Sequence, residues 1–474
     1  MKQLHELTIK EVLDGYTNKD FTCVDLVKHF LNRIEKYNSK LNIYLALNEK
    51  VIEEAIKIDK EIAEKGITRP LLGIPFAVKD NFLTIGIKTT AGSNILRGYN
   101  SQYESTVIEK IKATGAIILG KTNMDSFAHG SSTETSDYGT TLNPWNPEKL
   151  PGGSSGGSAA AISAQLATVA LGSETAGSIR QPSAWCGVTG LKPTYGRVSR
   201  YGVIAMASST DSPGPIGRSV EDCATVLEII SGKDSLDATT SPLPRESYTK
   251  NLEVPDLRGV RIGIVKEYLL SNMRDDLKNL ILNAADKFRL LGATVDEVSL
   301  MDPKYAIGVY TVIQRSEVSS NLARFDGTRF GGTRDLFCEE TKRRIMLGTY
   351  TLSAGYYDAF YKKAQAVRTK IVSEFAEVFK TYDAVIGAVS PSPALSVGAT
   401  KNQPMFGEME DVLLEPSSIA GLTSVSLPCG FVDRLPIGLQ ITSNQLKEST
   451  VIKIADCYQR HTEFQLFPDL EKTL

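Results

Sequence analysis

Two stretches of the chain place serine beside glycine, PGGSSGGSAAA at 151–161 and SETAGSIRQPS at 173–183. A serine hydroxyl is a poor nucleophile until a neighbouring base takes its proton. Histidine is the usual base, and the sequence contains only four, which are His5, His29, His129 and His461. Whether these serines do chemistry therefore depends on which group activates them.

The second stretch follows a predicted strand, residues 166–174, so TAGS at 175–178 is predicted to be a tight turn at the end of that strand. Such a turn can aim several backbone N–H groups at one point, as an oxyanion hole requires. We therefore expect Ser178 to lie beside its own amide and those of Thr175, Ala176 and Gly177. The first stretch precedes a predicted helix, whose first N–H groups are also free to point outward.

A lysine could supply the missing base. Lys79 closes the apolar strand predicted for GIPFAV, residues 73–78, so its side chain should be buried. Burial favours the neutral form of lysine, and bringing its pKa from about 10.4 to about 7 takes roughly 4–5 kcal/mol. One lysine cannot easily contact Ser178 and also serve the leaving group, so a relay serine between them would help. Ser154 and Ser155 both suit that position.

The composition indicates a class of protein and argues against several functions. The chain has 474 residues, of which 42% are hydrophobic and 23% charged, and its formal net charge is −2. That is the balance of a soluble globular protein, and the lack of an overall basic charge argues against nucleic acid as a direct, dominant ligand. Six cysteines are scattered without a CxxC pair, which suits a reducing compartment. With neither a signal-peptide pattern nor a membrane-span pattern, we expect a cytoplasmic protein.

The order of the predicted elements indicates an α/β fold. Residues 1–65 are predicted to be helical, with a helix over 22–37 capped by Thr22, and from about residue 70 helices alternate with short strands. That alternation predicts a single large doubly wound mixed sheet covered by helices on both faces. We expect one domain over 1–474, made of the helical segment 1–65, a core at 70–225 and the remainder, 226–474. The strands predicted in that remainder are 261–266, 293–300, 384–390, 423–431 and 436–442, and the helices are 275–291 and 353–381.

One motif fails the test of its context. Residues 115–122, GAIILGKT, satisfy the phosphate-binding pattern GxxxxGK[ST]. That pattern needs a loop that follows a strand, whereas the middle residues here are a β-branched apolar run after the helix predicted at 103–115. We interpret the run as a strand and not as a nucleotide site.

Three segments together resemble the amidase signature family. They are GIPFAVKDNF, PGGSSGGSAAA and GSETAGSIRQPSAWCGVTGLKPTYGRVSRYGV, and the similarity is densest between about 70 and 225. The resemblance implies the amidase signature fold and a Ser–cis-Ser–Lys triad. Carried onto this chain, it makes Lys79 the base, Ser154 the bridging serine and Ser178 the nucleophile that forms an acyl intermediate.

Further segments, residues 120–146, 319–331 and 342–371, resemble the glutaminase subunits of tRNA-dependent amidotransferases, a branch of that family. The resemblance implies that the chain hydrolyses glutamine and passes ammonia to a larger, tRNA-binding partner subunit. That partner, with ATP and Mg²⁺, would amidate glutamyl-tRNA(Gln) or also aspartyl-tRNA(Asn). The resemblance also implies a small third subunit, and hence a heterotrimer, with no cofactor or metal in this chain.

Glutamine recognition needs a cation for the α-carboxylate and an anion for the α-ammonium. The resemblance assigns the first role to Arg344, with Arg343 as the alternative. It assigns the second role to Asp411, and it places Tyr310 in the lining of the pocket.

The chain departs from the family pattern at several positions. Glu174 and Ala176 stand where aspartate and glycine are usual, and Ala176 needs a negative φ to avoid strain. Gln314 and Arg315 stand where small residues are usual. The alternative functions are a stand-alone amidase for a small or aryl amide and a non-catalytic assembly subunit, and the intact triad argues against the second.

Overall fold

One mixed sheet of 11 strands runs through the protein in the order β1-β3-β2-β4-β6-β5-β10-β11-β9-β7-β8. The computed structural model describes residues 2–329, 331–401, 403 and 405–474; Met1 and Phe330, which fall within the predicted segments 1–65 and 319–331, lie outside the described residues. The strands are β1 (Tyr44–Leu47), β2 (Pro75–Lys79), β3 (Ile117–Thr122), β4 (Val169–Glu174), β5 (Thr189–Lys192), β6 (Ser212–Gly217), β7 (Arg261–Val265), β8 (Thr294–Val298), β9 (Ala384–Ala388), β10 (Thr423–Val432) and β11 (Leu435–Ser443).

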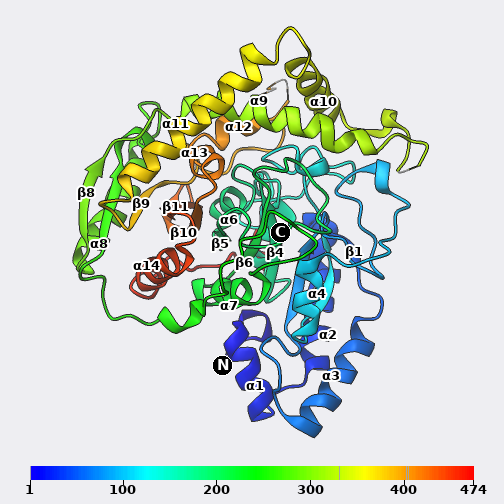
Figure 1. Cartoon of the computed structure of the whole chain (residues 1–474). Helices are drawn as coiled ribbons and strands as arrows, with labels where there is room; N and C mark the ends of the chain where they lie inside the picture. The colour runs from blue at the N-terminus through cyan, green and yellow to red at the C-terminus, as the bar shows by residue number, and fades with distance from the viewer. Residues whose placement is uncertain (1, 330, 402, 404) are drawn as a thin grey trace.

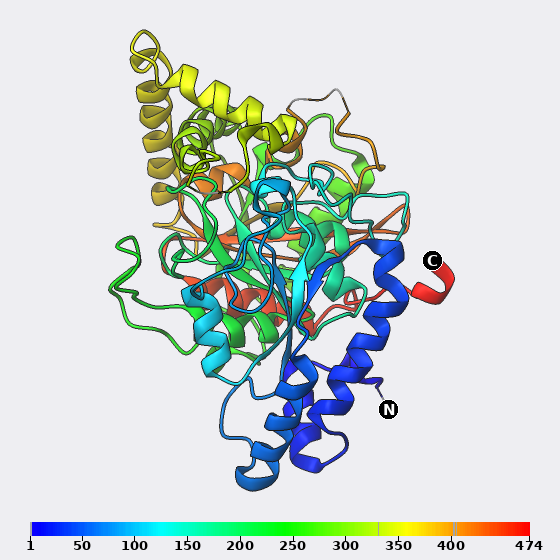
Figure 2. The same cartoon turned by 90° about the vertical axis from the view of Figure 1, so that its right-hand side faces the viewer.

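Helices cover both faces of the sheet (Figure 1). α5 and α6 pack together over the central strands, α7 and α14 pack on the other side, and α8 lies against β8, β9 and β10. α1 to α3 lie at one end of the molecule and α9 to α11 at the opposite end, as the two views agree (Figure 2). The helices are α1 (Ile9–Asn18), α2 (Cys23–Leu41), α3 (Val51–Lys65), α4 (Thr106–Ala113), α5 (Gly156–Ser163), α6 (Arg180–Cys186), α7 (Val220–Ile230), α8 (Asp275–Leu290), α9 (Lys304–Asn321), α10 (Glu339–Thr351), α11 (Lys363–Val378), α12 (Phe406–Glu410), α13 (Glu415–Ile419), α14 (Glu448–Arg460) and α15 (Leu470–Thr473).

The predicted α/β architecture is confirmed, and the N-terminal region shows where the prediction is right and where it fails. The helix predicted over 22–37 is α2, whose cap Thr22 accepts a hydrogen bond from the Asp25 amide at 3.0 Å. Within the segment predicted to be helical, residues 1–65, the structure also has the edge strand β1, which pairs antiparallel with β3. Four residues of strand are too short to show a clear period in the sequence.

The segment that matches the phosphate-binding pattern is not a loop. Gly115 takes a φ of +90° after α4, and β3 then occupies residues 117–122 between β1 and β2. Lys121 is fully buried, and its ammonium donates to the carbonyl of Phe82 at 2.6 Å and to the hydroxyl of Thr89 at 2.8 Å. The interpretation of this run as a strand is therefore confirmed.

Two central strands were not foreseen. β5 has only four residues, and β6 has the sequence SPGPIG, in which two prolines lack the amide donor that a ladder uses. β6 nevertheless pairs antiparallel with β4, with Pro213 opposite Ser173 and Pro215 opposite Leu171. Here tertiary packing outweighs the low local propensity of the sequence to form a strand.

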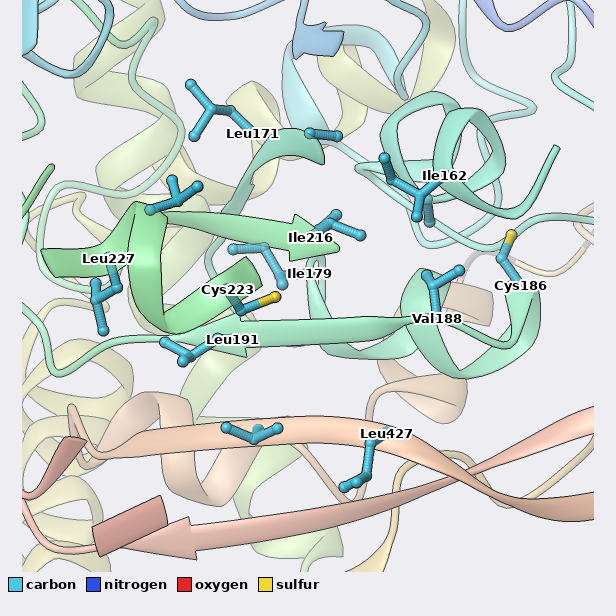
Figure 3. Packing of buried hydrophobic residues seen from close by; sticks show 14 of the residues in the cluster. Ile162, Leu171, Ile179, Cys186, Val188, Leu191, Ile216, Cys223, Leu227 and Leu427 are labelled. Carbon is cyan, nitrogen blue, oxygen red and sulfur yellow. The ribbon is translucent and has the colours of Figure 1, made fainter. Parts of the chain in front are cut away.

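The core beneath the second serine stretch is built around Ile179, the residue after Ser178. Its side chain lies among buried apolar residues that include Ile216 and Cys223 (Figure 3). Three strands present glycine to it, since a Cβ added at Gly172, Gly190 or Gly214 would lie 3.0–3.1 Å from atoms of Ile179. Ile179 thus anchors the loop that carries Ser178 to the middle of the sheet.

None of the helices in the described part of the chain is both long enough and apolar enough to cross a membrane.

Candidate active site

The parallel strands β2 and β4 bring the two serine stretches and the lysine to one edge of the sheet. Phe76 and Val78 of β2 pair with Val169 and Leu171 of β4 in parallel register. Both strands therefore end at the same side, where α/β proteins commonly bind ligands. Lys79 is the last residue of β2, and the loop 175–179 follows the end of β4.

Lys79 is fully buried at this edge. Its Nζ lies 2.8 Å from the Ser154 hydroxyl and 3.1 Å from the carbonyl oxygen of Ser173. Burial lowers the pKa of Lys79 to about 7, although the carboxylates of Asp125 and Asp211 favour the protonated form. A substantial fraction of this lysine is consequently neutral near neutral pH and can accept a proton.

The two serines that the spacing left open have different surroundings. Ser154, whose peptide bond with Gly153 is cis, holds its hydroxyl against Lys79. The Ser155 hydroxyl instead donates to the carbonyl of Ser173 at 3.2 Å and accepts from the amide of the same residue at 3.3 Å. The geometry therefore favours Ser154 as the group next to the lysine, with Ser155 fixed to the end of β4.

A buried ion pair holds the loop between β4 and α6. Glu174 accepts from Nε and from a terminal nitrogen of the Arg180 guanidinium at 2.8 and 2.6 Å, and both side chains are fully buried. Its other carboxylate oxygen accepts the amides of Ile179 and Arg180, each at 3.0 Å. Arg180 also donates to the carbonyl of Ala176 at 3.1 Å. Glu174, which departs from the family pattern, thus joins the end of β4 to the start of α6.

The four amides predicted as oxyanion donors belong to this loop. Within the described part of the chain, the amides of Thr175, Ala176, Gly177 and Ser178 donate no hydrogen bond. Ala176 keeps a negative φ, so its replacement of glycine causes no left-handed strain. Unpaired donors gathered in one turn are available for an anion that forms beside them.

Ser178 lies inside this arrangement with 4% of its surface exposed. Its carbonyl oxygen accepts the amide of Ser155 at 3.1 Å, which ties the two serine stretches together. The Ser178 hydroxyl has no hydrogen-bond partner among the residues that the structure describes. It is therefore not committed to a structural bond.

The predicted ammonium-binding residue, Asp411, lies directly against this loop. A Cβ added at Gly177 would stand 2.3 Å from Asp411 Oδ1, so only glycine fits there. The other carboxylate oxygen accepts the Ser131 hydroxyl at 2.7 Å. Burial raises the pKa of Asp411 well above its usual range.

Arg344 and Tyr310, predicted for the same pocket, come from α10 and α9. Arg344 is buried and donates through Nε to Glu340 at 2.7 Å. Nearly half of the Arg343 side chain is exposed, and its guanidinium pairs with Glu340 from the solvent side. Burial raises the pKa of the Tyr310 hydroxyl well above its usual range. The charge of Arg344 lowers this pKa and that of Asp411 raises it, so both groups lie near the hydroxyl. The three predicted residues therefore share one region. Of the two arginines, Arg344 is the one that the fold turns inward.

A set of buried charges around this region was not predicted from the sequence. Arg315 donates to Glu408 at 2.8 Å, and Arg344 reaches the same carboxylate oxygen at 3.5 Å. Nearby side-chain atoms lack a partner within the described residues. They belong to His129, Gln314, Arg315, Glu408, Asp411 and Glu415. The only sequence signals were the charged residues inside the apolar run DVLLEP and the large side chains at 314 and 315.

Asp125 and Asp211, also unforeseen, support the catalytic edge. A Cβ added at Gly153 would lie 2.1 Å from Asp125 Oδ2, so this carboxylate packs under the peptide that leads into Ser154. Asp211 accepts the Thr175 hydroxyl at 2.7 Å, and burial raises its pKa to about 6. Both favour the protonated form of Lys79 and so limit how far its pKa falls.

A cavity of about 1050 Å³ reaches this edge from outside. Its lining includes the buried residues Asn81, Ser173, Thr175 and Asp211, as well as less buried tyrosines and arginines such as Tyr201. Neither Ser178 nor Asp411 is among the described residues that line it. The cavity is therefore an approach to this edge of the sheet, and Ser173 and Thr175 line it where the loop begins.

These groups together can carry out acyl transfer. A lysine with a lowered pKa, a hydroxyl in contact with it, an uncommitted serine and a turn of free amides can supply base, relay, nucleophile and anion donors. This fold and site define an amidase, and the chain belongs to the amidase family, whose sequence profile matches residues 25–452.

Two individual relatives are similar to this chain over nearly its whole length. The chain is 45% identical over 477 residues to the A subunit of glutamyl-tRNA(Gln) amidotransferase from Geobacillus thermodenitrificans (strain NG80-2), covering 97% of this chain and 98% of the relative. It is also 45% identical over 478 residues to the protein of the same name from Oceanobacillus iheyensis, covering 97% of each.

Solved structures show the same fold. The crystal structure of the A subunit of glutamyl-tRNA(Gln) amidotransferase from Thermotoga maritima matches with a TM-score of 0.84 and 37% identity, over 99% of this chain and 98% of that one. The peptide amidase from Stenotrophomonas maltophilia matches with a TM-score of 0.85 and 28% identity, over 98% and 99% of the two chains.

Proposed function

We propose that this chain is the glutaminase subunit of a tRNA-dependent amidotransferase. It hydrolyses glutamine through an acyl-serine intermediate and supplies ammonia to a partner subunit, which converts glutamyl-tRNA(Gln) to glutaminyl-tRNA(Gln) with ATP. The 45% identity with two A subunits over nearly the whole chain supports this function over a stand-alone amidase.

The chemistry follows from the positions of Lys79, Ser154 and Ser178. Neutral Lys79 accepts the Ser154 proton while Ser154 takes the proton of Ser178, and the Ser178 oxygen attacks the carboxamide carbon of glutamine. The amides of residues 175–178 receive the negative charge on the carbonyl oxygen. The C–N bond then breaks, and the proton returns through Ser154 to the departing ammonia. Water releases glutamate from Ser178 by the same steps.

One observation carries this assignment, which is the contact of 2.8 Å between the buried Lys79 amine and the Ser154 hydroxyl. A surface lysine would stay protonated, and its ammonium could only donate. Here burial brings the pKa to about 7, so the amine can act as a base at neutral pH.

For glutamine recognition, the proposal assigns each charged end of the substrate to one residue. Arg344 takes the α-carboxylate of glutamine, Asp411 takes the α-ammonium, and Tyr310 closes the pocket beside them. The close approach of Asp411 Oδ1 to Gly177 supports this proposal, because Gly177 precedes Ser178 in the chain.

Partner subunits belong to the same proposal. Several large apolar side chains are exposed on the second half of α10 and the turns after it, namely Met346, Leu347, Tyr350, Leu352, Tyr356, Tyr357 and Phe360. Exposed apolar patches of this kind commonly mark interfaces, so they suit contact with the larger, tRNA-binding subunit. A small third subunit completes a cytoplasmic heterotrimer, and ATP and Mg²⁺ bind to the larger partner.

Co-expression with candidate large and small subunits tests the proposal. We expect the three chains to co-purify and glutamine hydrolysis to rise when glutamyl-tRNA and ATP are added. With Ser178→Ala, the complex should still form, but glutamine should no longer be hydrolysed. A stable, fully active monomer whose turnover ignores aminoacyl-tRNA would leave a stand-alone amidase as the function.

A further inference from the structure

We propose that Glu415 forms a second carboxyl of the substrate's ammonium site, together with Asp411, and thereby selects amides that carry a cationic amine. The proposal rests on the proposed glutaminase function and extends its substrate pocket by one residue. It concerns binding, and Glu415 takes no part in the proton transfers at Ser178.

Glu415 is fully buried, and yet its carboxylate has no hydrogen-bond partner among the described residues. It begins α13, its side chain is 0% exposed, and neither of its carboxylate oxygens accepts a hydrogen bond in the described structure. A buried polar group without hydrogen bonds costs about 1–3 kcal/mol or more of stability. Such a group is explained if a ligand supplies the missing donors.

The residue five positions earlier shows that burial alone does not produce this state. Glu410 is also buried, but one of its oxygens accepts the hydroxyls of Ser390 at 3.2 Å and Ser392 at 3.0 Å. Two buried glutamates of one short segment therefore differ in whether the protein satisfies them.

Glu415 stands one helical turn from Asp411, since its amide donates to the Asp411 carbonyl at 3.0 Å. Asp411 Oδ1 faces Gly177 of the catalytic loop and also lacks a partner among the described residues. The two carboxyls thus offer three unpartnered oxygens. A primary ammonium has three N–H donors, so the number of acceptors matches the number of donors.

The charge around the pair agrees with a cationic ligand. Burial raises the pKa of Glu415 well above its usual range, and the Glu408 and Asp411 carboxyls raise it further. Burial likewise raises the pKa of Asp411. An ammonium bound beside the two carboxyls would stabilise their ionised form against this effect of burial.

The competing explanation is that Glu415 balances the charge of Arg315. The Arg315 guanidinium favours the ionised form of Glu415, but within the described residues this guanidinium hydrogen-bonds to Glu408, at 2.8 Å. No hydrogen bond joins Arg315 to Glu415 in the same part of the chain. The experiment must therefore separate recognition of a substrate amine from pairing with this arginine.

The test compares Glu415→Gln with wild type on glutamine and on glutaramic acid, which is glutamine without its α-amino group. We expect Glu415→Gln to raise KM for glutamine about tenfold, with little change in kcat, and to leave KM for glutaramic acid within twofold. Glu410→Gln is the matched control, and it should change neither KM. An equal rise for both amides, or an unchanged KM for glutamine, would overturn the proposal.

Two further variants guard against other causes. If Glu415 only balances Arg315, the Arg315→Gln/Glu415→Gln protein should regain the wild-type KM for glutamine, and that result also overturns the proposal. Glu415→Met should fold at least as stably as wild type, because it removes a buried carboxyl without partners. It should still show the selective rise of KM for glutamine.

Failure of the glutaminase function would be visible separately. If the wild-type complex does not hydrolyse glutamine, the same comparison uses 4-aminobutanamide and butanamide, which differ only in the amine. A wild-type preference for the amine that disappears in Glu415→Gln supports the ammonium site without glutaminase activity. Equal use of the two amides by wild type overturns it.

Discussion

Lys79 allows a demanding test, because its proposed role predicts opposite effects on activity and on stability. Replacing it with methionine keeps the length of the side chain and removes the amine. We expect amide hydrolysis to fall by about three orders of magnitude or more, as for a base in a group of residues that act together. Lys79→Arg should be as damaging as Lys79→Ala, because arginine does not lose its proton in proteins.

The stability of the Lys79→Met protein should move the other way. Burial lowers the pKa of Lys79 from 10.5 to about 7, so holding the amine neutral costs the folded protein about 4–5 kcal/mol at pH 7. Removing the amine leaves the Ser154 hydroxyl without its partner, which costs about 1–3 kcal/mol. The variant should therefore be more stable than wild type by about 1–4 kcal/mol at pH 7.

The difference in unfolding free energy should depend on pH in one direction. Between pH 7 and 10.5 the unfolded chain binds the Lys79 proton and the folded protein does not, so wild-type stability rises with pH in this window. The advantage of Lys79→Met should shrink by about 2 kcal/mol between pH 7 and pH 9. Below pH 7 both states of wild type bind the proton, and the difference should level off.

Urea unfolding at pH 7 and pH 9, combined with the hydrolysis assay at both values, checks these expectations. Lys192→Met is the matched control, because burial also lowers the pKa of Lys192 to about 7 and its ammonium contacts only the carbonyls of Pro193 and Leu422 within the described residues. It should show the same trend of stability with pH and keep kcat. If Lys79→Met retained most of its activity, or lacked the pH trend that Lys192→Met shows, the reasoning about a neutral base would be refuted.

Three further outcomes follow from the same site. Ser178→Ala should abolish hydrolysis, and mass spectrometry of wild type with a slow glutamine analogue should find the acyl adduct on Ser178; an adduct elsewhere would remove the assignment. Arg344→Ala and Asp411→Ala should each lower kcat/KM for glutamine by a factor equivalent to roughly 2–4 kcal/mol, mostly through a higher KM. With Asp411→Ala, kcat/KM for glutamine without its α-amino group should fall much less. The rate of hydrolysis should rise with pH through about 7 as Lys79 loses its proton. The Asp211 carboxylate favours protonated Lys79, so Asp211→Asn should move this rise to lower pH in a pH–rate profile.

The sequence predicts most of this fold because its helices and strands have clear boundaries and periods. Thr22 begins α2 as a capping residue should, and the apolar run at 117–122 forms a strand despite its match to a phosphate-binding pattern. The strand β6 escapes prediction, since its two prolines disfavour a ladder and only pairing with β4 along its length makes it a strand. The short β1 escapes because an edge strand of four residues has too few positions for a pattern.

The residues of the candidate site also differ in how far the sequence predicts them. Lys79, Ser154 and Ser178 lie in stretches whose glycines and apolar flanks carry the information locally, so the sequence could predict the contact of Lys79 with a serine of the first stretch. The role of Ser178 stays a prediction. The surroundings of Arg315 and Glu415 could not be predicted, because only the packing of α9 and α13 buries Arg315 against Glu408 and Glu415 one turn from Asp411. A contact between residues far apart in the chain leaves no periodic trace in the sequence.

The polar groups near the catalytic loop divide into those that the protein satisfies and those that it does not. Glu174 and Arg180 share two hydrogen bonds and fill most of their remaining capacity with backbone and serine partners, so they act as a rigid support. Asp411 and Glu415 are equally buried but keep free oxygens within the described structure. A protein that could pair Glu174 so fully had the means to pair them too, and unpaired buried carboxyls lower stability. The persistence of this pair, with Asp411 against Gly177, is therefore best explained by a substrate that brings its own donors, so the unsatisfied carboxyls indicate a cationic ligand.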